Sequence, residues 1–150
     1  MPETEKITIM LPGYFPPSLN VTSGQHWAKT RKHKKLAEKH LLVACLRKFG
    51  RVPVFEGKVT LQVFRYIAGR RQMMDPDNLG GSQKPLIDAM RKPKSHRNSK
   101  GRQGGLGIIE DDDPSLLELL EPEQHKVTKD ELKGESIACI IEITGRRVDA

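Results

Sequence analysis

Residues 24–49 are the part of the chain that most constrains its fold, because this stretch contains no proline and is rich in Lys and Arg. Its larger side chains recur at near-helical spacing, at Trp27, Leu36, His40, Val43 and either Leu46 or Cys45. This spacing predicts a long amphipathic helix, and the following Gly50 is typical of a helix end. We therefore expect one long basic helix that ends at Gly50.

Four other segments have strand patterns, in which apolar and β-branched side chains cluster or alternate with polar ones: residues 6–11, 58–67, 116–120 and 136–144. Pro85 precedes a short apolar segment, residues 86–90, which is typical of a first helical turn and its continuation. The expected fold is therefore α/β (α+β), with a small mixed β-sheet, a long basic helix and a second short helix.

The length of 150 residues fits one domain, which can bury a core without disulfides or a structural metal. No run of about 18 apolar residues occurs and the amino terminus is acidic and polar, so we expect neither a membrane span nor a secretory signal. Cys45 and Cys139 lie far apart and form no CxxC pattern. Two reduced thiols in a cytoplasmic protein are expected.

Charge is distributed unevenly along the chain, whose formal net charge is +7. Residues 26–51 carry nine Lys and Arg against one acid, whereas residues 110–135 carry ten acids against three lysines. Residues 94–105 contain no apolar side chain, which predicts a mobile basic loop. Charge alone leaves open whether the basic regions bind nucleic acid or are a solvated surface. The candidate DNA contacts are Lys29, Arg31, Lys32, Lys34, Lys35, Arg70, Arg71, Arg97, Lys100 and Arg102.

The segment Asp75-Pro76-Asp77-Asn78 follows a strand and a basic turn. The proline between the two aspartates favours extended geometry, in which the backbone can aim both carboxylates at one point. Carboxylate oxygens are the ligands that Mg²⁺ and Mn²⁺ prefer. The same residue types are also ordinary turn formers, so a plain turn is the alternative.

A second acidic cluster, Asp111-Asp112-Asp113, follows the apolar pair Ile108-Ile109. Adjacent carboxylates repel one another unless a cation lies between them, and a solvated acidic turn is the alternative. Together the two clusters supply enough carboxylates to bind one or two divalent ions for in-line attack on a phosphodiester. Lys84 lies between them in sequence, where it either stabilises charge on a phosphate oxygen or is a surface lysine.

Other enzyme classes find no support. The chain contains no Walker A, GxGxxG, HExxH or GxSxG pattern, which argues against an NTPase, a dehydrogenase, a zincin and an α/β-hydrolase. Cys45 and His40 share the predicted helix, but a cysteine on an apolar face is more typical of a core than of a nucleophile.

In their order and spacing, these motifs resemble the RusA family of Holliday junction resolvases. The resemblance spans about residues 7–144 and rests on five segments: Pro16-Pro17-Ser18-Leu19-Asn20, His26-Trp27-Ala28, Asp75-Pro76-Asp77-Asn78-Leu79, Lys84-Pro85-Leu86-Ile87-Asp88-Ala89-Met90 and Gly107-Ile108-Ile109-Glu110-Asp111-Asp112. It implies a Mg²⁺-dependent endodeoxyribonuclease, with Mn²⁺ as an alternative metal, that resolves four-way DNA junctions in recombination and repair. It also implies a homodimer encoded by a bacterium or a phage.

The resemblance implies that Asp75, Asp77 and Asp112 are catalytic metal ligands, with Asp111 as the next candidate, and that Lys84 assists. Two features depart from the family pattern. The insertion Gly80-Gly81-Ser82 places Lys84 three residues further from Asp77, and Asp113 leaves the register of the later aspartates open.

Two other functions fit the same residues. One is a non-catalytic DNA-binding protein in which the aspartates only shape turns. The other is a metal-dependent nuclease that acts on flaps or other branched DNA.

Overall fold

The computed structural model describes residues 3–15, 27–69, 73–95, 102–103 and 105–149, with the side chains of residues 27–30, 77–78, 94–95 and 102–103 left out of that description. The elements are β1 (Glu5–Pro12), α2 (Trp27–Phe49), β2 (Phe55–Ala68), α3 (Pro76–Ser82), α4 (Lys84–Met90), β3 (Lys94–Ser95), β4 (Arg102–Gln103), β5 (Leu117–Leu119), β6 (Glu123–Val127) and β7 (Ile137–Arg147). The expectation of a mixed α/β fold is confirmed.

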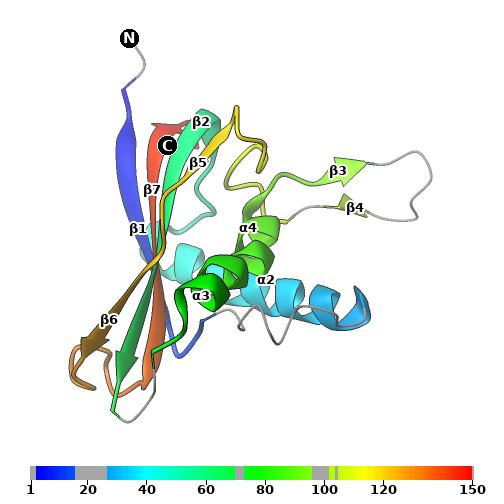
Figure 1. Cartoon of the computed structure of the whole chain (residues 1–150). Coiled ribbons are helices and arrows are strands. Elements are labelled where there is room, and N and C mark those ends of the chain that lie inside the picture. The colour runs from blue at the N-terminus through cyan, green and yellow to red at the C-terminus, as the bar shows by residue number, and fades with distance from the viewer. Residues whose placement is uncertain (1–2, 16–26, 70–72, 96–101, 104, 150) are drawn as a thin grey trace.

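A five-stranded mixed sheet forms the body of the domain (Figure 1). Its order is β1-β7-β2-β5, and β6 pairs with the same edge of β2 as β5 does, further along the strand. Strand β7 is antiparallel to both β1 and β2, whereas β5 and β6 run parallel to β2. The hairpin β3–β4 projects away from this sheet (Figure 1).

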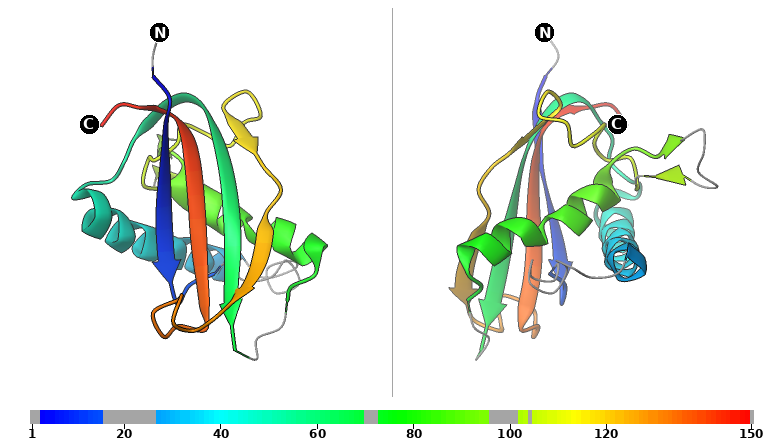
Figure 2. Two further views of the ribbon diagram at one scale, coloured as in Figure 1. Left: turned by 90° about the vertical axis from the view of Figure 1, so that its left-hand side faces the viewer. Right: turned by 45° about the vertical axis from the view of Figure 1, so that its right-hand side comes forward.

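The described helices all cover one face of the sheet, and none of them lies on the other face (Figure 2). Alternation along the strands explains this arrangement, because every second side chain of β2 is buried from Val59 to Ile67. The same pattern buries Ile7, Ile9 and Leu11 of β1. The strand pattern predicted for residues 58–67 is therefore confirmed, as are those for residues 6–11 and 136–144.

Helix α2 ends at Phe49 as predicted, but most of the described side chains whose spacing predicted it do not face the core. Leu36, Val43 and Leu46 are exposed, and the buried stripe is Ala37, Leu41 and Cys45, of which only Cys45 was among the predicted positions. These three residues recur every four positions and pack against α4 and β1. Cys45 and Cys139 are both free and buried, as expected.

Other elements differ from the sequence-based expectation. Strand β6 was not predicted, because its sequence EQHKV is mostly polar. The loop expected over residues 94–105 begins and ends in the paired strands β3 and β4, while residues 96–101 and 104 lie outside the described part. Among the described helices, none is long and apolar enough to cross a membrane.

Candidate functional site

The acidic loop, defined here as residues 110–113, is held against the end of α4 by backbone hydrogen bonds. The Ile109 N–H donates to the Met90 carbonyl oxygen at 3.1 Å, and the Lys92 N–H donates to the Ile109 carbonyl oxygen at 3.0 Å. Ile108 and Ile109 are fully buried. This apolar pair therefore fixes where the acidic loop begins.

Gly105 allows the chain before this loop to approach α4 closely. Its N–H donates to the Arg91 carbonyl oxygen at 2.7 Å, and the next N–H, of Leu106, donates to the Ala89 carbonyl oxygen at 2.8 Å. A Cβ atom at Gly105 would lie 1.8 Å from that Ala89 oxygen, well inside contact distance. Only glycine fits here without moving the backbone.

Arg91 lies among three carboxylates. Its Nη1 atom is 3.6 Å from Oδ1 of Asp111 and 3.6 Å from Oδ1 of Asp112, and its Nε atom is 3.6 Å from Oδ1 of Asp88 in α4. These distances make ion pairs but exceed ordinary hydrogen-bond lengths. Within the described part of the chain, the buried Nε has no hydrogen-bond partner. We call Asp88, Asp111, Asp112 and Arg91 the acidic centre.

The structure separates the three neighbouring aspartates of the loop by role. Asp111 and Asp112 face Arg91. Asp113 instead accepts hydrogen bonds from the Ser115 N–H at 2.9 Å and from its hydroxyl at 3.0 Å. Such a bond two residues ahead is an ordinary turn-stabilising contact. Asp111 and Asp112 are therefore the pair that faces Arg91, and Asp113 stabilises the turn.

Lys84 lies at the start of α4, beside the acidic centre. Its Nζ atom is 3.9 Å from Oδ1 of Asp88, and its side chain is 75% exposed. Lys84, Asp88 and Asp112 line one groove of about 420 Å³. The Gly80-Gly81-Ser82 insertion forms the last residues of helix α3, and Lys84 begins α4 two residues later.

Asp75 and Asp77 are not in the extended arrangement expected from the sequence. Asp75 is extended, with φ −60° and ψ 145°, but Pro76 begins α3, so Asp77 lies in a helical turn. Proline is favoured at a first helical position, where its missing N–H has no helical partner. The Asp75 side chain is exposed and does not cap the helix, and the Asp77 side chain lies outside the described part.

A polar clamp holds the residue before Asp75, and sequence reasoning missed it. The Gln124 side chain of β6 accepts a hydrogen bond from the Met74 N–H at 2.8 Å and donates one to the Met74 carbonyl oxygen at 2.5 Å. Arg65 of β2, which is buried, donates to the same Gln124 oxygen at 3.0 Å. The Gln124 side-chain amide thus makes the same two hydrogen bonds to the Met74 backbone that a paired strand would make.

The described residues bring together only part of the predicted site. Lys84, Asp111 and Asp112 meet around α4, and they are joined by Asp88, which the sequence reasoning did not select. Asp75 lies at the far end of the α3–α4 pair. Across the described side chains, no three His, Cys, Asp or Glu residues are close enough together to hold a metal ion.

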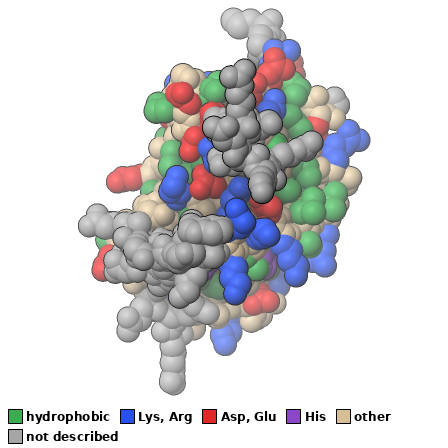
Figure 3. Space-filling view, turned by 90° about the vertical axis from the view of Figure 1, so that its right-hand side faces the viewer, with side chains coloured by type: hydrophobic (Ala, Val, Ile, Leu, Met, Phe, Trp, Pro, Cys, Tyr) green, Lys and Arg blue, Asp and Glu red, His purple; other side chains and the backbone are tan. Residues whose placement is uncertain are grey.

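The predicted DNA contacts that can be placed lie on α2. Arg31, Lys32 and Lys35 are exposed, and Lys34 is partly buried with its Nζ atom 3.9 Å from Oε1 of Glu38. Figure 3 shows Lys and Arg side chains gathered on the middle and lower right of the helix-covered side. Outside the described part lie Arg70, Arg71, Arg97, Lys100 and the side chains of Lys29 and Arg102.

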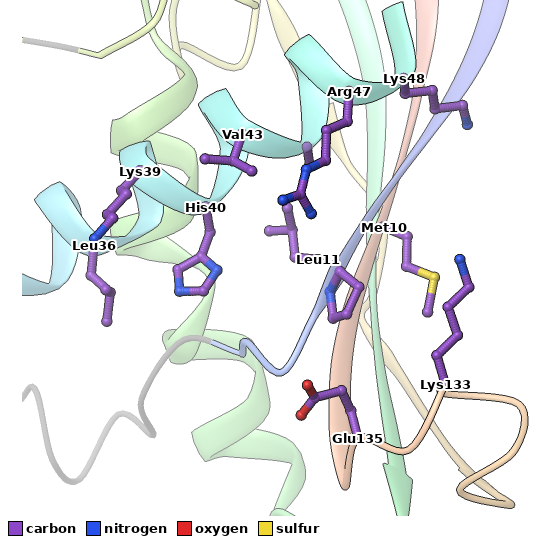
Figure 4. A pocket seen from close by; sticks show the side chains of 12 residues that line it. Met10, Leu11, Leu36, Lys39, His40, Val43, Arg47, Lys48, Lys133 and Glu135 are labelled. Atoms are coloured by element: carbon purple, nitrogen blue, oxygen red, sulfur yellow. The ribbon is translucent and has the colours of Figure 1, made fainter.

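A larger groove, of about 670 Å³, lies between α2 and the end of β1 (Figure 4). His40 and Arg47 point into it from α2, and Glu135 is the one carboxylate among its described lining residues. This groove therefore offers no acidic centre. Burial raises the pKa of Cys45, a core residue of the same helix, to about 11, so its thiol stays protonated at neutral pH and is a poor nucleophile.

Comparison with known proteins does not assign this chain to a family. No protein-family model matches this chain, and no curated protein matches it either.

Proposed function

We propose that this protein is a divalent-metal-dependent endodeoxyribonuclease that cleaves four-way DNA junctions, as its resemblance to the RusA family implies. The observation that supports this function best is the groove shared by Lys84, Asp88 and Asp112. It combines carboxylates with a lysine at α4, and α2, which packs against α4, carries the exposed residues Arg31, Lys32 and Lys35, whose charge suits a polyanion.

The acidic centre offers carboxylates of the type that binds a hard divalent cation. Its donors are carboxylate oxygens, which Mg²⁺ and Mn²⁺ prefer, and a cationic group already lies among them. Arg91 Nε is buried without a hydrogen-bond partner among the described residues. The metal ligands implied by the resemblance are Asp75, Asp77 and Asp112, with Asp111 as the next candidate.

When bound, the metal would supply an activated water and would neutralise charge on the scissile phosphate. The protein's own side chains would bind the phosphates and orient the DNA strand. Lys84 is exposed at the groove, where its ammonium can donate to a phosphate oxygen as negative charge develops. Arg31, Lys32 and Lys35 would hold neighbouring phosphates and so orient the strand.

A homodimer is part of this proposal, because symmetric cleavage of a junction requires two sites related by a two-fold axis. Two centres of the kind described would then act on opposed strands.

Cleavage of three labelled substrates tests the proposal: a synthetic four-way junction, a flap and a linear duplex, each with Mg²⁺ or with EDTA. We expect paired nicks in opposed strands of the junction with Mg²⁺ only. Binding without cleavage in Mg²⁺ and in Mn²⁺ would identify a non-catalytic DNA-binding protein. Faster cleavage of the flap would identify a nuclease for other branched DNA.

A further inference from the structure

We propose that one groove of the domain binds an extended acidic peptide of a partner protein, which adds a strand to the sheet. This groove, here called the edge groove, lies between residues 36–48 of α2 and residues 10–12 of β1 and has a volume of about 670 Å³. Its described lining residues include none of the acidic centre. The inference therefore goes beyond the proposed nuclease and does not depend on it.

The first argument is that β1 lies at the end of the five-stranded sheet, so no described strand pairs with its outer edge. In an antiparallel pair, residues that bond to the neighbouring strand alternate with residues whose backbone groups point away from it. The Gly13 N–H donates to the Ile137 carbonyl oxygen at 2.8 Å, so the residues of β1 in phase with Gly13 bond to β7. The backbone groups of Thr8 and Met10 consequently point to the outer edge, where Lys48 donates to the Thr8 carbonyl oxygen. Met10 thus directs both an N–H and a carbonyl oxygen at an added strand.

The second argument is the shape of the edge groove, whose wall opposite β1 is helix α2 (Figure 4). Leu36 and Val43 of this wall are 47% and 42% exposed, and the buried Leu11 lies on the strand side. A groove between an edge strand and a helix suits an extended peptide, because backbone bonds hold the peptide and every second side chain enters the groove. Apolar side chains of the peptide would therefore pack against Leu36 and Val43.

The third argument is the charge around the edge groove. Its described lining residues include four exposed cations and one carboxylate, namely Lys39, Arg47, Lys48, Lys133 and Glu135. Figure 4 shows Lys39 and Arg47 on α2 and Lys133 on the other side of the groove. Opposite charge steers and orients a partner, whereas a basic peptide would be repelled. The partner segment is therefore acidic.

A DNA strand fits the edge groove less well than a peptide does. Protein–DNA interfaces are more polar than protein–protein interfaces, whereas this groove exposes Leu36 and Val43. Phosphates only accept hydrogen bonds, so they cannot pair with a backbone carbonyl oxygen at the strand edge. The residues proposed above to hold phosphates, Arg31, Lys32 and Lys35, are not among the described residues that line the groove.

Fluorescence anisotropy of a labelled synthetic peptide, titrated with the full chain at physiological salt, tests the proposal. The peptide has about ten residues, in which Leu alternates with Asp or Glu. We expect saturable binding, and Arg47→Glu, which reverses an exposed charge of the groove, should weaken it by about tenfold or more. Lys35→Glu is the matched control, because Lys35 is exposed on the same helix outside the groove. It lies about 18 Å from Arg47 along the helix, about twice the screening length, and its reversal should change affinity less than about twofold.

The added strand has a separate test on the unaltered protein. Two peptides of the same sequence carry N-methyl groups on alternate backbone amides, one peptide for each of the two sets. Only one set can face β1, because successive amides of a strand point to opposite edges. We expect one methylated peptide to bind about fivefold or more weakly and the other to stay within about twofold of the parent peptide.

No saturable binding, equal losses for Arg47→Glu and Lys35→Glu, or equal losses for the two methylated peptides would overturn the proposal. Two other occupants would overturn it as well. Displacement of the peptide by duplex DNA that Arg47→Glu binds about tenfold more weakly would identify a DNA surface. A wild-type dimer in sedimentation that Val43→Glu converts to a monomer would identify a contact between copies. Junction cleavage without peptide binding would reject the edge groove and keep the nuclease, and peptide binding without cleavage would do the reverse.

Discussion

Replacing Gln124 with alanine removes three hydrogen bonds at the polar clamp, namely those with Arg65 and with both backbone groups of Met74. A net contribution of about 1 kcal/mol for each of the two neutral bonds, and about 2 kcal/mol for the bond from a charged donor, gives a loss of about 4 kcal/mol. The buried Arg65 also loses an acceptor. We expect the free energy of unfolding to fall by this amount.

The clamp also positions Asp75, which follows Met74 directly. A misplacement of about 1 Å near reacting groups can reduce a rate by about a hundredfold. Gln124→Ala should therefore slow single-turnover junction cleavage by about 10- to 100-fold and leave junction affinity unchanged. Urea denaturation and cleavage at saturating enzyme, below the unfolding transition, measure the two effects.

Gln62→Ala is the matched control. Gln62 lies on β2, the strand that pairs with β6, and donates hydrogen bonds to Glu121 and Glu123, but these bonds are exposed and do not reach Met74. Gln62→Ala should lower the free energy of unfolding by about 1 kcal/mol or less and leave the cleavage rate within about twofold of wild type. Equal destabilisation by both substitutions would refute the clamp, and a destabilised Gln124→Ala protein with a normal rate would refute its role in positioning Asp75.

Three further outcomes are expected. Asp75→Asn and Asp77→Asn should each slow cleavage by about a hundredfold or more, while junction affinity is kept or improved. Gel-shift assays in Ca²⁺ measure the affinity, and cleavage assays in Mg²⁺ measure the rate. Unchanged cleavage by both variants would remove these residues from the metal site. Gly105→Ala should lower the free energy of unfolding by about 1 to 3 kcal/mol, because the new Cβ atom meets the Ala89 carbonyl oxygen. Gly80→Ala is the control, because a Cβ atom there has open space and should not destabilise the protein. Equal effects of the two substitutions in urea denaturation would contradict the tight packing at Gly105. Hydrogen bonds from Arg147 hold the pKa of Asp149 below its ordinary value, so Asp149→Asn should destabilise the protein at pH 7. The difference in free energy of unfolding between variant and wild type should shrink as the pH falls below about 4. Urea denaturation at pH 7 and pH 3 measures this difference, and an equal difference at both would contradict the prediction.

The strands with alternating side chains were the easiest part of the fold to predict. Residues 58–67 need one buried face, and period-two alternation determines which side chains it contains. Strand β6 has no such pattern, because Gln124 and its neighbours are polar and the strand forms by pairing with β2. In α2, spacing predicted the helix but not its buried face, since Leu36, Val43 and Leu46 are exposed while Ala37 and Leu41 face the core together with Cys45.

The candidate site was predictable in its residue types but not in its arrangement. The carboxylates of Asp111 and Asp112 were selected because adjacent acids repel unless a cation intervenes, and the structure places the Arg91 guanidinium beside them. Arg91 and Asp88 belong to no local acidic motif. They join the site only because Ile109 pairs with the end of α4, a contact between distant segments that the sequence does not specify.

Cleavage of a four-way junction by Asp112→Asn and Asp113→Asn proteins, each with Mg²⁺ and with EDTA, tests the central claim most directly. The two residues are neighbours with the same chemistry, but Asp112 faces Arg91 and lines the groove of Lys84, whereas Asp113 is bonded to Ser115. We predict Mg²⁺-dependent paired nicks by wild type, a loss of about a hundredfold or more in rate for Asp112→Asn, and a rate within about threefold of wild type for Asp113→Asn. Equal rates for the two variants, or cleavage that persists in EDTA, would contradict a metal-dependent nuclease built on the acidic centre.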